Sequence, residues 1–180
     1  MFLPQLEHNF SVYFKNRWRV TTKRRLGVKN AIIYVSIHHG NTEKVAKTFA
    51  KILDADLKKP EQIEPSGLSD YELIGFGSGI YFGKHHKSLR KFAKKLPPTN
   101  KKAFIFSTCG GTHGKIMSVE NYHKPLKTIL TAKGFNIVGE FNCNGFDTFG
   151  LLKLVGGISK ERPNEEDLKN AERFAENLIK

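Results

Sequence analysis

Short apolar runs alternate with segments of helical periodicity from Lys29 to the end of the chain, and this alternation limits the fold more than any other feature. The runs at 31–35, 73–77 and 103–106 contain aliphatic residues, aromatic residues and glycine, as in strands buried on both faces. Between these runs, apolar residues recur every three or four positions, which is the helical period. Because alternating strands and helices form βαβ units around a parallel sheet, the chain predicts an α/β fold.

The pattern predicts one doubly wound domain with five parallel strands and about five helices. We expect strands near residues 31–35, 55–57, 73–77, 103–106 and 135–141. The fourth helix is predicted to start near Pro125, because proline is tolerated in a first turn, and to end at Gly134. The last helix is predicted to begin after Asn164, with Asp167 three residues later as in a capping box. A length of 180 residues suits one such domain.

Residues 1–28 form a basic, aromatic N-terminal extension ahead of the predicted domain at 29–180. The extension holds six Lys or Arg residues against Glu7 alone, and the whole chain has a formal net charge of +13. A positive field attracts phosphate-bearing ligands, nucleic acid and acidic protein surfaces. The extension keeps no regular period, so we expect a poorly ordered or loosely docked terminus. The alternatives are a nucleic-acid arm or contact with anionic surfaces such as a membrane.

Several classes of protein are disfavoured by composition. No run approaches the roughly 18 consecutive apolar residues of a transmembrane segment. The two cysteines, Cys109 and Cys143, are too few for a disulfide framework or a four-cysteine zinc site. No apolar signal segment precedes a cleavage site. We therefore expect a soluble protein of the reducing cytoplasm, with no obligatory nucleic acid.

Ligands of open parallel α/β sheets bind beyond the carboxyl ends of the strands, so the loops after the first, third and fourth predicted strands are the candidate sites. The first loop, at 36–42, offers hydroxyls, an amide and backbone N–H groups at the start of a helix. Such a helix start binds phosphate without a lysine, although the same hydroxyls could simply cap the helix. The chain lacks the GxxxxGK[ST] motif of P-loop proteins, and its glycine cluster does not open a helix after the first strand, as dinucleotide binding requires.

These loops resemble those of flavodoxins. The segment at 34–46 ends its loop with Gly40-Asn41-Thr42, as the flavodoxin phosphate loop does, but it has one extra residue after Ser36 and two histidines where small residues are usual. The stretch DYELIGFGSGIYFG at 70–83 is similar to the family's third strand and flavin loop, and STCGG at 107–111 occupies the place of its second flavin loop. The resemblance covers about 29–180. It implies a three-layer sandwich with sheet order 2-1-3-4-5.

The resemblance also implies FMN as the cofactor and assigns residues to it. The phosphate group would be surrounded by Ser36, His38, His39, Gly40, Asn41 and Thr42. The ring system would be approached by Ser78, Gly79, Ile80, Tyr81, Phe82 and Gly83, and its other edge by Thr108, Cys109, Gly110 and Gly111. Glycine lets backbone amides come close to the ring, and an aromatic side chain can stack on it. For the two aromatic residues, ordinary core packing is an equal alternative.

Two other residue groups invite hypotheses. Five of the seven histidines (His38, His39, His85, His86 and His113) lie in the three loops, yet neighbouring loop residues seldom direct both rings at one ion, so we expect no metal site. The two cysteines are expected at the carboxyl ends of neighbouring strands, and we expect unpaired thiols rather than a redox pair. The long segment at 143–162 either covers the ring edge with Phe146, Asp147, Phe149, Leu151 and Leu152 or packs on itself as a surface loop.

The leading interpretation is an FMN-containing electron carrier that serves redox protein partners, for which acidic partners would suit the charge. A carrier needs no acid, base or nucleophile, so we assign no catalytic residue. The first alternative is an oxidoreductase acting on a quinone or porphyrinogen, with His113 or Tyr122 delivering a proton. The second is a flavin-free scaffold whose basic tail binds nucleic acid or a membrane.

Overall fold

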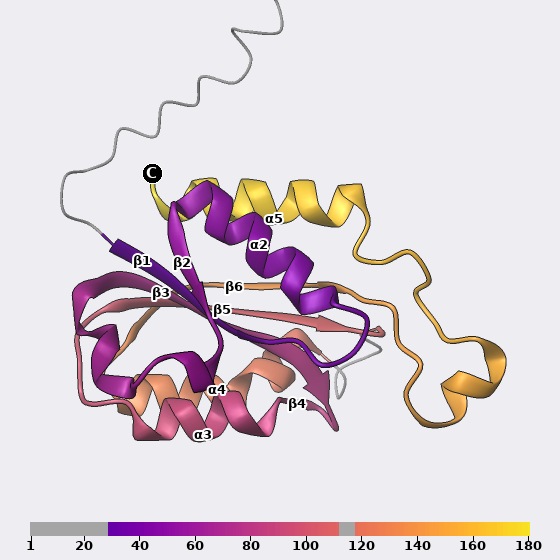
Figure 1. Ribbon diagram of the computed structural model, residues 1–180, viewed down its shortest axis with the longest axis horizontal. Coiled ribbons are helices and arrows are strands. Elements are labelled where there is room, and N and C mark those ends of the chain that lie inside the picture. The colour runs from indigo at the N-terminus through magenta and orange to yellow at the C-terminus, as the bar shows by residue number, and fades with distance from the viewer. Residues whose placement is uncertain (1–28, 112–117) are drawn as a thin grey trace, which may run out of the picture.

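The protein contains a parallel sheet with helices on both faces (Figure 1). The computed structural model describes residues 29–111 and 118–180. The parallel strands are β1 (Lys29–Val35), β2 (Ala55–Lys58), β3 (Tyr71–Tyr81), β5 (Lys102–Cys109) and β6 (Asn136–Asn144). Their order in the sheet is β2-β1-β3-β5-β6, which is the predicted order 2-1-3-4-5. The fold class is therefore confirmed. The predicted extension at 1–28 and His113 lie outside the described residues.

Four α-helices cover the sheet within the described ranges, two on each face (Figure 1). On one face lie α2 (Asn41–Leu53) and α5 (Glu165–Leu178), and on the other lie α3 (Lys87–Lys95) and α4 (Val119–Ala132). Three short 3₁₀ segments, η1 (Pro60–Gln62), η2 (Pro65–Asp70) and η3 (Gly150–Val155), belong to the connections. No helix among residues 29–111 and 118–180 is long and apolar enough to span a membrane.

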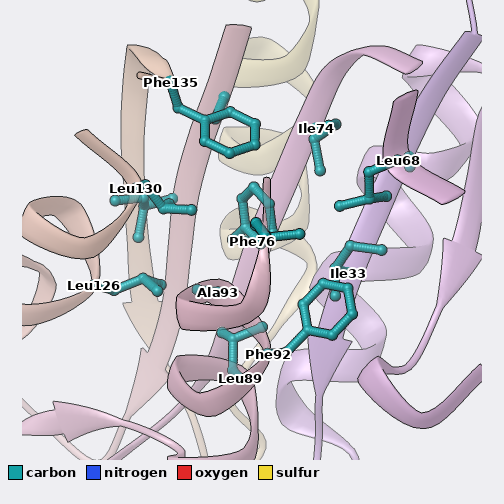
Figure 2. Close-up of a cluster of buried hydrophobic side chains, with 14 of the residues drawn as sticks. Ile33, Leu68, Ile74, Phe76, Leu89, Phe92, Ala93, Leu126, Leu130 and Phe135 are labelled. Carbon is teal, nitrogen blue, oxygen red and sulfur yellow. The ribbon is translucent and has the colours of Figure 1, made fainter. Parts of the chain in front are cut away.

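Alternating strand residues build one apolar core on each face of the sheet. Ile33 and Phe76 pack with Leu89, Phe92 and Leu126 beneath α3 and α4, as Figure 2 shows. On the opposite face, the Phe49 ring of α2 makes edge contacts with the rings of Phe104, Phe106 and Phe141, at centroid distances of 5.2, 5.1 and 5.4 Å. Since both faces are buried, the central strands are apolar along their buried lengths, which is why these stretches show no alternation.

The prediction that the fourth helix starts near Pro125 is wrong. Helix α4 begins six residues earlier, at Val119, and Pro125 lies inside it. The Ser118 hydroxyl caps this start by accepting a hydrogen bond from the Asn121 backbone N–H at 3.3 Å. The extra turns are stabilised by burial of Tyr122 against the rest of the protein. A good cap and tertiary burial thus outweigh the backbone hydrogen bond that a proline cannot donate.

One strand boundary differs from the prediction, one short strand was not predicted, and one helix start is confirmed. Strand β3 continues to Tyr81, because its last two residues pair with the antiparallel two-residue strand β4 (Lys84–His85), which was not predicted. The capping box of α5 is present as predicted. The Asn164 side chain accepts from the Asp167 N–H at 3.1 Å, and the Asp167 carboxylate accepts from the Asn164 N–H at 3.0 Å.

Candidate functional site

A cavity of about 310 Å³ opens at the carboxyl ends of β1, β3 and β5. Its walls contain residues from all three loops that the sequence singled out: His38, Asn41, Thr42, Gly79, Ile80, Tyr81, Phe82, Gly83, Thr108, Cys109, Gly110 and Gly111. Four other predicted residues, Ser36, His39, Gly40 and Ser78, adjoin these in the chain and are not part of the walls. The fold therefore brings the three loops together around one space.

The start of α2 lacks a side-chain cap, which matters because the first N–H groups of a helix have no partner inside it. The cap residue is Gly40, held at φ 67°, a conformation that favours glycine. Thr42 does not cap the helix, because its hydroxyl is hydrogen bonded to the Thr108 hydroxyl at 2.8 Å. The Asn41 side chain instead donates to the Phe146 carbonyl at 2.8 Å. The explanation that these residues serve only as caps therefore does not hold.

One buried polar atom beside this helix start is unsatisfied. Among the described residues, the Ser36 hydroxyl oxygen is buried without a hydrogen-bond partner. Buried hydroxyls are normally paired, so an unpaired one needs an explanation. Together with the free N–H groups and the positive end of the α2 dipole, it forms a set of donors suited to an anion.

The two loop histidines face different parts of the structure. The His38 ring lines the cavity, and its centroid lies 6.2 Å from that of Tyr81. His39 has φ 56°, its Nε2 lies 2.9 Å from the Thr148 hydroxyl, and its ring packs at 4.4 Å from Phe146. Within residues 29–111 and 118–180, no group of three or more His, Cys, Asp or Glu residues is placed to hold a metal ion.

Ser78 braces the end of β3. Its buried hydroxyl lies 2.7 Å from the Gly79 carbonyl and 3.0 Å from His85 Nδ1, and it accepts from the His86 N–H at 2.9 Å. These bonds hold the β3–β4 hairpin, whose turn contains Phe82 and Gly83 at φ 50° and 73°. Ser78 therefore fixes the position of the residues that line the cavity.

The wall beside β3 combines a close backbone approach with an aromatic ring. A Cβ atom at Gly79 would lie 3.1 Å from the Tyr81 ring, so a larger residue there would require this ring to shift by a few tenths of an ångström. Burial raises the pKa of the Tyr81 hydroxyl, and the Asp147 carboxylate raises it further. The phenol therefore stays protonated at neutral pH. The Tyr122 hydroxyl, whose pKa burial also raises, lines the same cavity.

The two cysteines are unpaired, as predicted. Cys109 lies opposite Asn144 in the β5–β6 register, whereas Cys143 lies opposite Thr108. Since successive side chains point to opposite faces of a sheet, the two thiols project in opposite directions. Burial raises the pKa of Cys109, and it raises that of Cys143 to about 12. Both thiols are therefore protonated and poorly reactive near neutral pH.

The segment at 143–162 packs on itself, as one of the two alternatives predicted, and it also forms a wall of the cavity. Asp147 and Ile158 form an antiparallel bridge that closes the loop, and the Ser159 hydroxyl donates to the Gly110 carbonyl at 2.6 Å. A Cβ atom at Gly110 would lie 2.8 Å from Asp147, so the two loops touch closely. Phe146, Asp147, Phe149, Leu152 and Ile158 line the cavity, while the Leu151 side chain lies outside the described part.

A pair of buried histidines lies behind the cavity, and the sequence analysis did not identify it. The rings of His85 and His123 have centroids 5.1 Å apart. His123 bonds to the Ser107 hydroxyl at 2.8 Å and to Glu140 at 3.0 Å. Burial lowers the pKa of His85 well below its ordinary value, and the neighbouring His123 and Arg90 lower it further. Burial also lowers the pKa of His123, against the opposing effect of Glu140. Both rings are therefore neutral near pH 7.

The doubly wound sheet and the donor-rich cavity at its carboxyl edge define a flavodoxin-like protein. A family model described as a flavodoxin domain matches residues 31–139, and the chain belongs to the flavodoxin family. An uncharacterized protein of Methanocaldococcus jannaschii is 53% identical over 153 residues, which are 85% of this chain and 99% of the relative.

Solved structures agree on the fold. Oxidised flavodoxin 2 from Bacillus cereus has a TM-score of 0.62 at 19% identity, over 84% of this chain and 98% of its own. A flavodoxin from the domain Archaea has a TM-score of 0.56 at 16% identity, over 84% and 96% of the two chains. Membership of the family implies a flavin-binding redox protein with redox protein partners.

Proposed function

We propose that the protein binds FMN in this cavity and carries electrons between redox proteins. The observation that carries the proposal is the uncapped start of α2, whose residues Asn41 and Thr42 line a cavity that also reaches Tyr81 and Gly110. The buried, unpaired Ser36 hydroxyl lies in the loop that leads into this helix start. One end of such a site suits a phosphate, and the other suits a planar ring. FMN combines both groups.

Different residues would bind different parts of the cofactor. Ser36, His38 and the N–H groups from Gly40 to Thr42 would bind the phosphate at the positive end of the helix dipole. Residues 78–83 would hold one edge of the ring, with Tyr81 stacking on it and Ser78 positioning the hairpin from behind. Residues 108–111 would hold the other edge. The bound group would supply electron transfer, and the chain would set its orientation and exclude water.

A second function, reduction of a quinone or porphyrinogen, is favoured by one feature. The apolar side chains of Phe149, Leu152 and Ile158 extend the cavity wall beyond the three loops, where a flat substrate could lie. The protonated Tyr122 hydroxyl in the same wall could deliver a proton. Turnover with NAD(P)H and a quinone would distinguish a reductase from a carrier.

FMN binding is tested by the absorption spectrum of the purified protein and by fluorescence titration with FMN and with riboflavin. We expect quenching of FMN at micromolar concentrations. Ser36→Ala should weaken FMN binding about tenfold, because a hydrogen bond to a charged group is lost, and should leave riboflavin binding nearly unchanged. Ser66→Ala, at an exposed serine in η2, is the matched control. A colourless protein that quenches neither ligand would refute the proposal.

A further inference from the structure

We propose that an apolar collar beside the cavity, flanked by lysines, is the docking surface for an acidic redox protein. The collar consists of Phe82, Phe149, Leu154 and Val155. The collar lysines are Lys84, Lys87, Lys153 and Lys160. The inference rests on the proposed function for the partner's redox role, but the surface itself is defined by this chain's side chains.

The collar is made of large apolar side chains that are exposed to solvent. Phe82 is 87% exposed, Leu154 is 82% exposed and Val155 is 72% exposed. The Phe82 ring, at the tip of the β3–β4 hairpin, packs edge-on against Phe149 at a centroid distance of 5.4 Å. The segment that carries Leu154 and Val155 projects beyond the carboxyl ends of the strands (Figure 1). Large exposed apolar side chains gathered beside a ligand cavity indicate a site of protein contact.

Four lysines lie around the collar, and the Asp147 carboxylate, which accepts a hydrogen bond from the Phe149 N–H, lies beside it. Lys84 follows the Phe82 turn, Lys153 precedes Leu154, and the Lys160 ammonium group lies near Gly156. Lys87 begins α3, a helix with five Lys or Arg residues and no carboxylate. Within the described ranges, no carboxylate forms an ion pair with any of the four collar lysines. Their charges are therefore available to a partner.

These charges select the occupant of the collar. A second copy of this chain is disfavoured, because the net charge of +13 makes two copies repel each other. The basic N-terminal extension is disfavoured for the same reason, since it carries six Lys or Arg residues against Glu7. An acidic protein with an apolar centre complements both parts of the surface. Its contact would desolvate the collar in the middle and pair with lysines at the rim.

The position of the collar suits electron transfer. Phe82 and Phe149 belong both to the collar and to the cavity wall, so a partner bound there would lie against the mouth of the cavity. The lysines would steer the encounter through their field, whereas the apolar side chains would determine how long the complex lasts.

Binding is tested with a plant-type ferredoxin, a small acidic iron–sulfur protein, by titration calorimetry on the full chain with and without added FMN. A basic cytochrome c serves as the comparison partner. We expect the ferredoxin to bind at low ionic strength, the affinity to fall with added salt, and the cytochrome to bind much more weakly. The doubly charge-reversed variant Lys153→Glu/Lys160→Glu should weaken ferredoxin binding at least tenfold.

The matched control reverses two exposed charges away from the collar, Lys94→Glu in the last turn of α3 and Lys169→Glu on α5, and should retain most of the binding. Leu154→Ser/Val155→Ser should weaken binding about fivefold without changing the salt dependence, since it removes apolar area alone. Circular dichroism verifies that each variant is folded.

Several outcomes would overturn the proposal. The first is an equal loss of ferredoxin affinity in the collar and control variants, and the second is no binding to the ferredoxin at low salt. The third is tighter binding of a single-stranded oligonucleotide at the same lysines. The fourth is a dimer of this chain that the collar variants dissociate. Failure of FMN binding with intact, collar-dependent ferredoxin binding would refute the proposed cofactor and leave the docking surface standing.

Discussion

Ser107 and Thr108 are neighbours in β5 but point to opposite faces of the sheet. Comparing the two faces distinguishes groups that are open to a ligand from groups that stabilise the structure. Thr108 points toward α2 and bonds to Thr42, next to helix N–H groups that no side chain caps. Ser107, one residue earlier, points to the other face and bonds to His123 in a buried network with Glu140. On the α2 face, donors remain open to a ligand. On the α4 face, polar groups mostly satisfy one another, so their role is to hold the strand ends in place.

The largest expected effect tests the bracing network. His123→Ala removes a buried ring and leaves Ser107 and Glu140 without their partner, so we expect the free energy of unfolding to fall by about 3 kcal/mol. FMN affinity, measured under conditions where the variant is folded, should change little. Urea denaturation and FMN titration provide the two measurements. A large loss of FMN affinity with unchanged stability would reverse the roles assigned to the two faces.

The next effect is a dependence of stability on pH. The folded pKa of His85 is lower than the ordinary value, so the unfolded chain binds the proton more readily. Its contribution to stability is complete above the unfolded pKa of about 6.5 and is lost as pH falls below that value, with a limiting slope of about 1.4 kcal/mol per pH unit.

This pH dependence is measured by urea denaturation between neutral and mildly acidic pH. His85→Asn removes the titrating ring. In this variant, the slope of the free energy of unfolding against pH should be smaller by the contribution of one proton. Ser66→Ala, at an exposed serine that does not titrate, is the control and should keep the slope of the unchanged protein. Identical slopes in all three proteins would mean that His85 is not buried as a neutral ring.

A smaller effect is expected on the binding face. Thr108→Val breaks the hydrogen bond to Thr42 while keeping the side-chain volume, and should cost about 1 kcal/mol of stability. FMN binding should weaken more than it does in the matched variant Ser107→Ala on the opposite face. Equal effects on FMN binding would remove the distinction between the faces.

The sheet order could be predicted because β1, β3 and β5 are apolar along their buried lengths, and runs of this kind have few other interpretations. The start of α4 was placed too late because the proline signal at Pro125 was preferred to the Ser118 cap, and because burial of Tyr122 is a tertiary effect. Strand β4 was missed because two residues are too short to show a period.

The three loops of the site were identified because the chain order of parallel strands brings their carboxyl ends together. The orientation of Ser78 was beyond the sequence, since a strand buried on both faces does not reveal which side chain points to which face. Gly145 and Ile158 also line the cavity, but no feature of the sequence around them indicates this. Ile158 reaches the cavity only because its bridge to Asp147 folds the segment back.

The hydrogen bond from the Asn41 side chain to the Phe146 carbonyl joins the beginning of α2 to the segment that bears Leu154 and Val155. A coupling between docking and cofactor binding would be carried by this bond. Thermodynamic reciprocity then applies: if a docked protein prefers the loaded form, docking must retain the cofactor more firmly by the same factor. An electron carrier with this coupling would hold its cofactor most tightly while it is bound to a redox partner.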